Sequence, residues 1–143
     1  MLFMYSSEKD LVDNFLSKLL VDDPWDTSAY KVEFNYMRGK TDIIAVSPSN
    51  ELIAIEAKLN KWRFALQQAY RNRCFADKSY ILLPYDIATN ALRYEYEFCR
   101  RGVGICSLIN GEIVILRDAK ADNPVQPWLR EVALNYVEGG ERF

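Results

Sequence analysis

Three consecutive segments with the periodicity of β-strands constrain the fold of this chain more than any other feature. The first alternates aromatic and β-branched residues from Ala29 to Met37, and the second is the strongly β-forming segment from Thr41 to Val46. The third, Glu51 to Leu59, alternates strictly between two sets of side chains. Turn-forming residues join the segments at Arg38-Gly39-Lys40 and at Ser47-Pro48-Ser49-Asn50. The pattern predicts three neighbouring antiparallel strands.

Helical segments flank these strands. Ser7 can cap a first helix through Asp10, and apolar residues recur at helical spacing as far as Leu20, before Asp22-Asp23-Pro24 stops the helix. The later predicted elements are a helix at Lys61–Ala76, a strand at Ser79–Leu83, a helix at Ala88–Arg101, strands at Val103–Ile109 and Glu112–Leu116 joined by Asn110-Gly111, and a helix at Trp128–Val137 ending at Gly139-Gly140. This αβββαβ order, extended by a helix, a β-hairpin and a final helix, predicts one α/β domain over residues 1–143 with a central mixed sheet.

Composition excludes several kinds of site. The 143 residues include no histidine, which removes the usual general base and the commonest metal ligand. The three cysteines, Cys74, Cys99 and Cys106, lack CxxC spacing and argue against a disulfide framework or a zinc site. With a net charge of -2, any positive surface for nucleic acid must be local. No secretory signal and no bilayer-length apolar run is present, so we expect a cytoplasmic protein without membrane association.

Asp42, Glu56 and Lys58 are the candidate catalytic residues. Glu56 and Lys58 project from the same face of their strand because side chains alternate along a strand. If the turn pairs Val46 with Leu52, the register places Asp42 directly opposite Glu56, with Cβ atoms about 4.5 to 5.5 Å apart. Carboxylates this close repel unless a proton or cation lies between them, and oxygen ligands suit Mg²⁺ or Mn²⁺. The set predicts metal-dependent phosphodiester hydrolysis, with Asp42 and Glu56 binding the metal and Lys58 acting on the water.

The same spacing also fits a structural role. Asp42 would then simply end a strand, and Glu56 and Lys58 would form a solvated ion pair on one face of the sheet. This alternative predicts that the protein has neither metal affinity nor activity.

The order of elements and these motifs resemble the PD-(D/E)XK nuclease superfamily, which has the restriction-endonuclease-like fold. Thr41-Asp42-Ile43-Ile44 looks like the aspartate element of the second strand, and Ile55-Glu56-Ala57-Lys58 looks like the ExK element of the third. The resemblance implies that an acidic residue on the first helix, here Glu8, supports the site. It also implies a glutamine on the following helix that contacts metal or water, matched by Gln68 with Gln67 as its rival.

Two positions depart from the pattern. The nominal proline of the motif is Thr41, a position that is poorly kept among relatives. The tyrosine that some relatives place four residues after the glutamine is Asn72, although Tyr70 is nearby. The second departure argues against assignment to the branch with a QxxxY motif and leaves the subfamily open.

The resemblance implies a Mg²⁺-dependent deoxyribonuclease, and more specifically an endonuclease, that works as a homodimer or with a recognition partner protein. Basic residues around the helix after the ExK strand are candidates for contacts with DNA phosphates: Lys61, Arg63, Arg71 and Arg73. Trp62 and Phe64 either stack on bases or, more commonly for such residues, pack on the sheet. The alternative function is a catalytically inactive nuclease-fold module for DNA binding or protein assembly.

Overall fold

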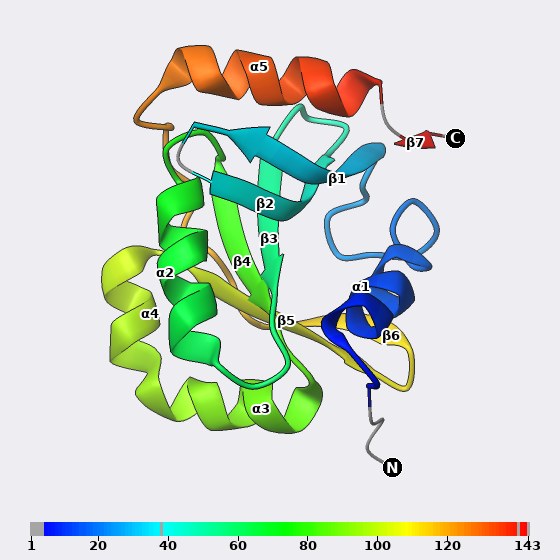
Figure 1. Ribbon diagram of the computed structural model, residues 1–143, viewed down its shortest axis with the longest axis vertical. Coiled ribbons are helices and arrows are strands. Elements are labelled where there is room, and N and C mark those ends of the chain that lie inside the picture. Colours follow the sequence, from blue (N-terminus) through cyan, green and yellow to red (C-terminus); the bar gives the residue numbers. More distant parts are fainter. Residues whose placement is uncertain (1–4, 38, 140, 143) are drawn as a thin grey trace.

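A seven-stranded mixed sheet forms the centre of the computed structural model, which describes residues 5–37, 39–139 and 141–142 (Figure 1). The strands are β1 (Ala29–Tyr36), β2 (Gly39–Val46), β3 (Leu52–Ala57), β4 (Lys78–Leu82), β5 (Gly104–Ile109), β6 (Glu112–Arg117) and β7 (Glu141–Arg142). Their order across the sheet is β6-β5-β4-β3-β2-β1-β7. The predicted mixed α/β architecture is confirmed. The sequence predictions that involve residues 1–4, Arg38 and Gly140 lie outside the described residues.

The sheet has a parallel centre with antiparallel strands on each side. β1, β2 and β3 form an antiparallel meander, β3, β4 and β5 run parallel, and β6 returns antiparallel to β5 through the predicted turn at Asn110-Gly111. Both residues of that turn have positive φ angles, 51° and 80°, as a two-residue hairpin requires. The short strand β7, which the sequence pattern does not predict, pairs with β1.

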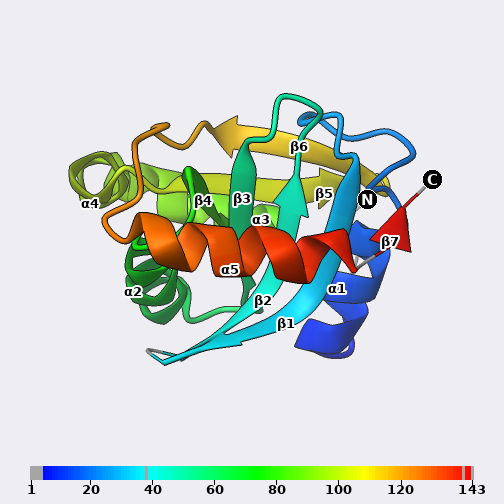
Figure 2. The same cartoon turned by 90° about the horizontal axis from the view of Figure 1, so that it is seen from above.

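Helices cover both faces of the sheet. They are α1 (Glu8–Leu16), α2 (Trp62–Asn72), α3 (Tyr85–Ala91), the 3₁₀ turn η1 (Leu92–Tyr94), α4 (Glu95–Arg101) and α5 (Pro127–Glu138). On one face, α1 buries Leu11 and Phe15 against Ile43 and Ile55. On the other face, α2, α3 and α4 pack over β4 and β5, and α5 lies across β1, β2 and β3 (Figure 2). No helix in the described part of the chain has the length and apolar character needed to cross a bilayer.

Three predicted helices differ from the observed ones. The first ends at Leu16 instead of Leu20, because Leu20 takes a positive φ of 74° in a turn that buries Leu19 in the core. The helix predicted at Lys61–Ala76 ends at Asn72, and residues 73–75 form a turn. The helix predicted at Ala88–Arg101 begins earlier, at Tyr85, and is interrupted by η1. The interruption redirects the chain between α3 and α4 (Figure 1). Residues of α3 and Phe98 of α4 belong to the same buried cluster.

A distortion in β1 and β2 positions the candidate site. Glu33 has a positive φ of 56°, and the β1–β2 register omits Glu33 and Asp42. Before this point Val32 packs with the α1 side of the sheet, whereas Phe34 after it packs with the α5 side. Val32 and Phe34 are two residues apart and would share a face in a regular strand, so the side chains of β1 exchange faces at Glu33. Thr41 correspondingly turns toward α2, and Asp42 borders a cavity beside α1.

Candidate active site

Asp42 lies where the hydrogen-bonded pairing of β2 and β3 ends. The register is the predicted one, with Val46 opposite Leu52, but its last pair is Ile43 with Ile55. The expected direct cross-strand pair of Asp42 with Glu56 is therefore not part of the ladder. Instead, Asp42 Oδ2 accepts a hydrogen bond of 2.9 Å from the backbone N–H of Ala57. The carboxylate takes the place of a backbone acceptor because the strand distorts opposite Glu33.

Glu56 is a buried carboxyl group next to Asp42. Its side chain is 1% exposed, and its Oε2 accepts a hydrogen bond of 2.7 Å from Asn72 Nδ2. Its Oε1 is buried and has no hydrogen-bond partner among the described residues. Burial, followed by the negative charge of Asp42, raises the pKa of Glu56 to about 8, although the hydrogen bond from Asn72 and the charge of Arg71 oppose the rise. Glu56 thus favours a proton or a cation at this position.

Asn72 is a site residue that the sequence reasoning did not assign. Its side chain is fully buried, and its Oδ1 accepts hydrogen bonds from Tyr36 OH at 2.7 Å and Thr41 Oγ1 at 2.9 Å. Two hydroxyl donors on Oδ1 leave Nδ2 to face Glu56, so the orientation of the amide is determined by its partners. The sequence did carry a signal for Asn72. Positions 41 and 72 are the two at which this chain departs from the PD-(D/E)XK pattern that it resembles.

Replacing Asn72 by leucine should lower the free energy of unfolding by roughly 2 to 4 kcal/mol, because the buried Thr41 and Glu56 side chains and the half-buried Tyr36 hydroxyl would lose their partner. Urea denaturation in EDTA measures the change. Gln67→Ala, an exposed change on the same helix, is the matched control and should stay within about 0.5 kcal/mol of wild type. A loss below about 1 kcal/mol for Asn72→Leu would contradict the network.

Lys58 extends the site toward α1. It follows β3 directly, and its Nζ lies 3.7 Å from Glu8 Oε2 and 4.8 Å from the centroid of the Phe64 ring. Glu8 and Asp42 line one cavity of about 480 Å³ with Ala57. The structure therefore brings Asp42, Glu56, Lys58 and Glu8 together around the end of β3.

Gln68 is less closely tied to the site. It is half-buried on α2, one helical turn before Asn72, whereas its rival Gln67 is exposed. Neither side chain makes a hydrogen bond with any described residue. The polar contact from α2 to Glu56 comes from Asn72 instead.

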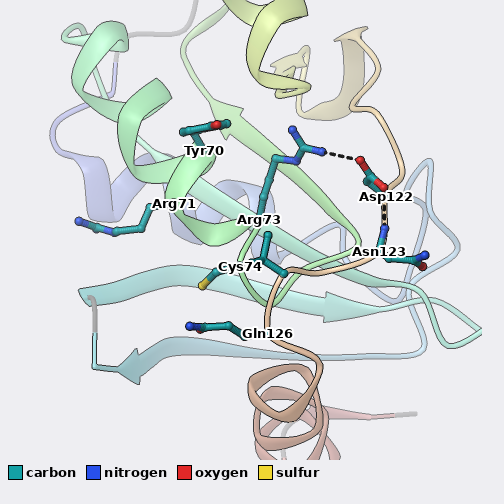
Figure 3. A pocket seen from close by; sticks show the side chains of 8 residues that line it. Tyr70, Arg71, Arg73, Cys74, Asp122, Asn123 and Gln126 are labelled. Carbon is teal, nitrogen blue, oxygen red and sulfur yellow. Dashed lines mark hydrogen bonds and ion pairs between the residues drawn. The ribbon is translucent and has the colours of Figure 1, made fainter.

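The four predicted phosphate-contacting residues have different environments. Lys61 is exposed at the start of α2, and Arg63 forms a two-bond ion pair with Glu97 at 2.9 and 3.2 Å. Arg73 donates to the backbone carbonyl of Arg101 and pairs with Asp122 at 3.1 Å, along a second cavity of about 410 Å³. Arg71 lines the same cavity as Arg73, and Figure 3 shows the two side chains pointing in different directions.

Arg71 also lies close to the candidate site. Its guanidinium lies against Gly39, where any Cβ atom would collide with it. Its Nε is buried and has no hydrogen-bond partner among the described residues. Because its charge favours the ionised form of Glu56, Arg71 contributes to the electrostatics of the carboxylate pair.

The donor set fits a hard divalent cation. Glu56 Oε1 is a buried oxygen without a partner, and the Asp42 carboxylate beside it adds negative charge that repels the ionised form of Glu56. No group of three or more Asp, Glu, Cys or His side chains suited to a metal is found among the described residues. Any metal would therefore be held by two protein carboxylates, with its other ligands from water, backbone or substrate.

No protein-family model matches this sequence, and no curated protein matches it. Among solved structures, a protein of unknown function from Silicibacter pomeroyi aligns over 94% of this chain and 86% of its own, with a TM-score of 0.68 and 14% sequence identity. The two chains share a fold.

Two further solved structures are more weakly similar. SfsA of Pyrococcus furiosus, in complex with Ca²⁺, is 13% identical over 64% of this chain and 54% of its own, with a TM-score of 0.36. A repair endonuclease from Pyrococcus abyssi is 12% identical over 84% of this chain and 50% of its own, with a TM-score of 0.44. The chain spans about half the length of each.

Proposed function

We propose that this chain is a metal-dependent deoxyribonuclease of the PD-(D/E)XK type, with a restriction-endonuclease-like fold, that hydrolyses DNA phosphodiester bonds as an endonuclease. The observation that carries the proposal is the buried Glu56 at the end of β3: its Oε1 has no hydrogen-bond partner among the described residues, and the charge of Asp42 disfavours its ionised form. A purely structural ion pair does not require a carboxyl group that is 1% exposed and destabilised in its charged form.

The residues have distinct roles in this proposal. Asp42 and Glu56 would hold Mg²⁺ or Mn²⁺, which polarises a phosphate oxygen and acidifies water when bound. Asn72 donates a hydrogen bond to Glu56 Oε2 and leaves Oε1 as the oxygen that would bind the cation. Lys58 Nζ donates to the attacking water or the phosphate and stabilises the charge that develops on phosphorus oxygens. Glu8, 3.7 Å from Lys58, positions that amine.

Calorimetric titration of Mn²⁺ tests the metal site directly. Wild type should bind one Mn²⁺, and Asp42→Ala should lose at least about tenfold in affinity because one of two carboxylate ligands is removed. Asp118→Ala is a control because Asp118 also lies near a strand end, after β6, but outside the site. A wild type without Mn²⁺ affinity would refute the catalytic proposal.

A cleavage assay on linear, supercoiled and branched DNA accompanies the titration. Cleavage by wild type that disappears in Asp42→Ala supports the nuclease. Metal binding with no cleavage of any of these substrates favours the alternative, a nuclease-fold module for DNA binding or assembly. A circular substrate that is cut distinguishes endonuclease from exonuclease action, since it offers no DNA end.

A further inference from the structure

Two aromatic residues at the start of α2 lie in different environments. Trp62 is 9% exposed, and its ring lies 5.4 Å from Phe98 and 5.3 Å from Tyr94, so it packs in the core as expected. Phe64 is 52% exposed, and no other aromatic ring in the described part of the chain contacts it. The structure therefore separates a packing residue from one that presents its ring to solvent.

Exposure alone does not indicate a function for Phe64, since single apolar side chains are common on protein surfaces. The position of the ring is the second observation, because the Nζ of Lys58 lies 4.8 Å from its centroid. The same amine lies 3.7 Å from Glu8, which borders the cavity that Asp42 lines. The exposed ring is thus a direct neighbour of the proposed catalytic lysine.

We propose that Phe64 is a stacking platform for an unpaired base of the substrate, next to the phosphate that binds at Lys58. This inference rests on the proposed nuclease function and names its substrate class, which is single-stranded or locally unpaired DNA. One nucleotide can reach both residues because its base and phosphate are joined through a single sugar. Bases inside a duplex are already stacked on both sides, so only an unpaired base can present its face to the ring.

The charges around Phe64 are compatible with a nucleic acid strand. Lys61 precedes it by three residues, is exposed, and forms no ion pair with a described residue, so it is available to a flanking phosphate. Arg63 is differently engaged, because Glu97 holds its guanidinium over the rings of Trp62 and Tyr94. Basic groups beside an aromatic ring are the combination that single-strand binding surfaces use.

Equilibrium binding of a fluorescein-labelled oligonucleotide tests the platform. Anisotropy is measured in EDTA, so that no metal-dependent cleavage occurs, for a single strand and for its duplex. Phe64→Leu keeps apolar cover for Lys58 but removes the aromatic face, and it should weaken single-strand binding about tenfold while leaving duplex binding within about twofold. Phe64→Trp should restore or exceed wild-type binding.

Trp128→Leu is the matched control because Trp128 is 58% exposed but lies on α5, away from Lys58. It should bind both DNA forms as wild type does.

If Phe64→Leu weakened the binding of single strand and duplex equally, or of neither, the stacking platform would be refuted. Cleavage in Mn²⁺ separates the two proposals: a wild type that cuts no DNA refutes the nuclease, whereas cleavage that Phe64→Leu leaves unchanged on single strands refutes only the platform.

Discussion

Lys58→Met should reduce the rate of DNA cleavage by about 10³-fold, because its amine would no longer donate to the water or phosphate in the transition state. Affinity for Mn²⁺ should not fall, since removing a positive charge near two carboxylates cannot weaken their attraction for a cation. Single-turnover cleavage at saturating Mn²⁺, paired with calorimetry, measures both quantities. The combination of lost rate and retained metal separates Lys58 from Asp42, whose replacement should remove both.

A second lysine provides the control for this substitution. Lys18 is also paired with a glutamate, Glu112 at 3.1 Å, but it lies beyond α1 and outside the proposed site. Lys18→Met should cleave DNA at the wild-type rate. If Lys58→Met reduced the rate by less than about tenfold, Lys58 would be a structural ion-pair residue only.

Glu56→Gln should stabilise the metal-free protein at neutral pH by a few kcal/mol and abolish its metal affinity. The folded-state pKa of Glu56 is raised from 4.5 to about 8, mainly by burial and then by Asp42. Between these pKa values the folded protein holds a proton that the unfolded chain releases. The wild-type free energy of unfolding should therefore be highest below about pH 4.5 and fall as the pH rises toward 8. The neutral glutamine side chain does not titrate, so its contribution to stability does not fall with pH. It can still accept a hydrogen bond from Asn72 Nδ2.

Urea denaturation in EDTA at several pH values between 4.5 and 8 measures this difference. Glu51→Gln is the control, because Glu51 is a partly exposed glutamate just before β3 with only a 3.9 Å contact to Lys78. Its stability should follow the wild-type pH curve. A Glu56→Gln protein that is less stable than wild type at pH 8 would contradict the raised pKa.

The affinity for metal should depend on pH in the opposite direction to the stability of the metal-free protein. A bound cation favours ionised Glu56, so binding releases a proton and the affinity for Mn²⁺ should rise with pH up to about 8. Loss of stability in the metal-free state and gain of affinity for metal are thus two consequences of one buried carboxyl group. This exchange of stability for function is typical of active sites.

The sequence alone determined that β1, β2 and β3 neighbour one another, that β5 pairs with β6, and the register of β2 with β3. The turn at residues 47–50 is short, and period-two alternation leaves one pairing that buries the apolar faces, so Val46 opposite Leu52 follows from local information. Asp42, Glu56 and Lys58 come together for the same reason, because β2 carries Asp42 and the adjacent strand β3 carries Glu56 and leads directly to Lys58.

Only the tertiary structure decided how these residues are arranged. At Glu33 the side chains of β1 exchange faces, and Asp42 leaves the ladder and accepts a hydrogen bond from the backbone N–H of Ala57. A strict period of two does not predict this arrangement. The contact of Asn72 with Glu56 joins α2 to β3, and neither helical period nor strand period relates two such distant positions. Burial raises the pKa of Glu56, and no spacing along β3 shows how deeply the surrounding elements bury it. Local spacing specifies which groups meet, whereas their protonation and orientation depend on what distant elements place around them.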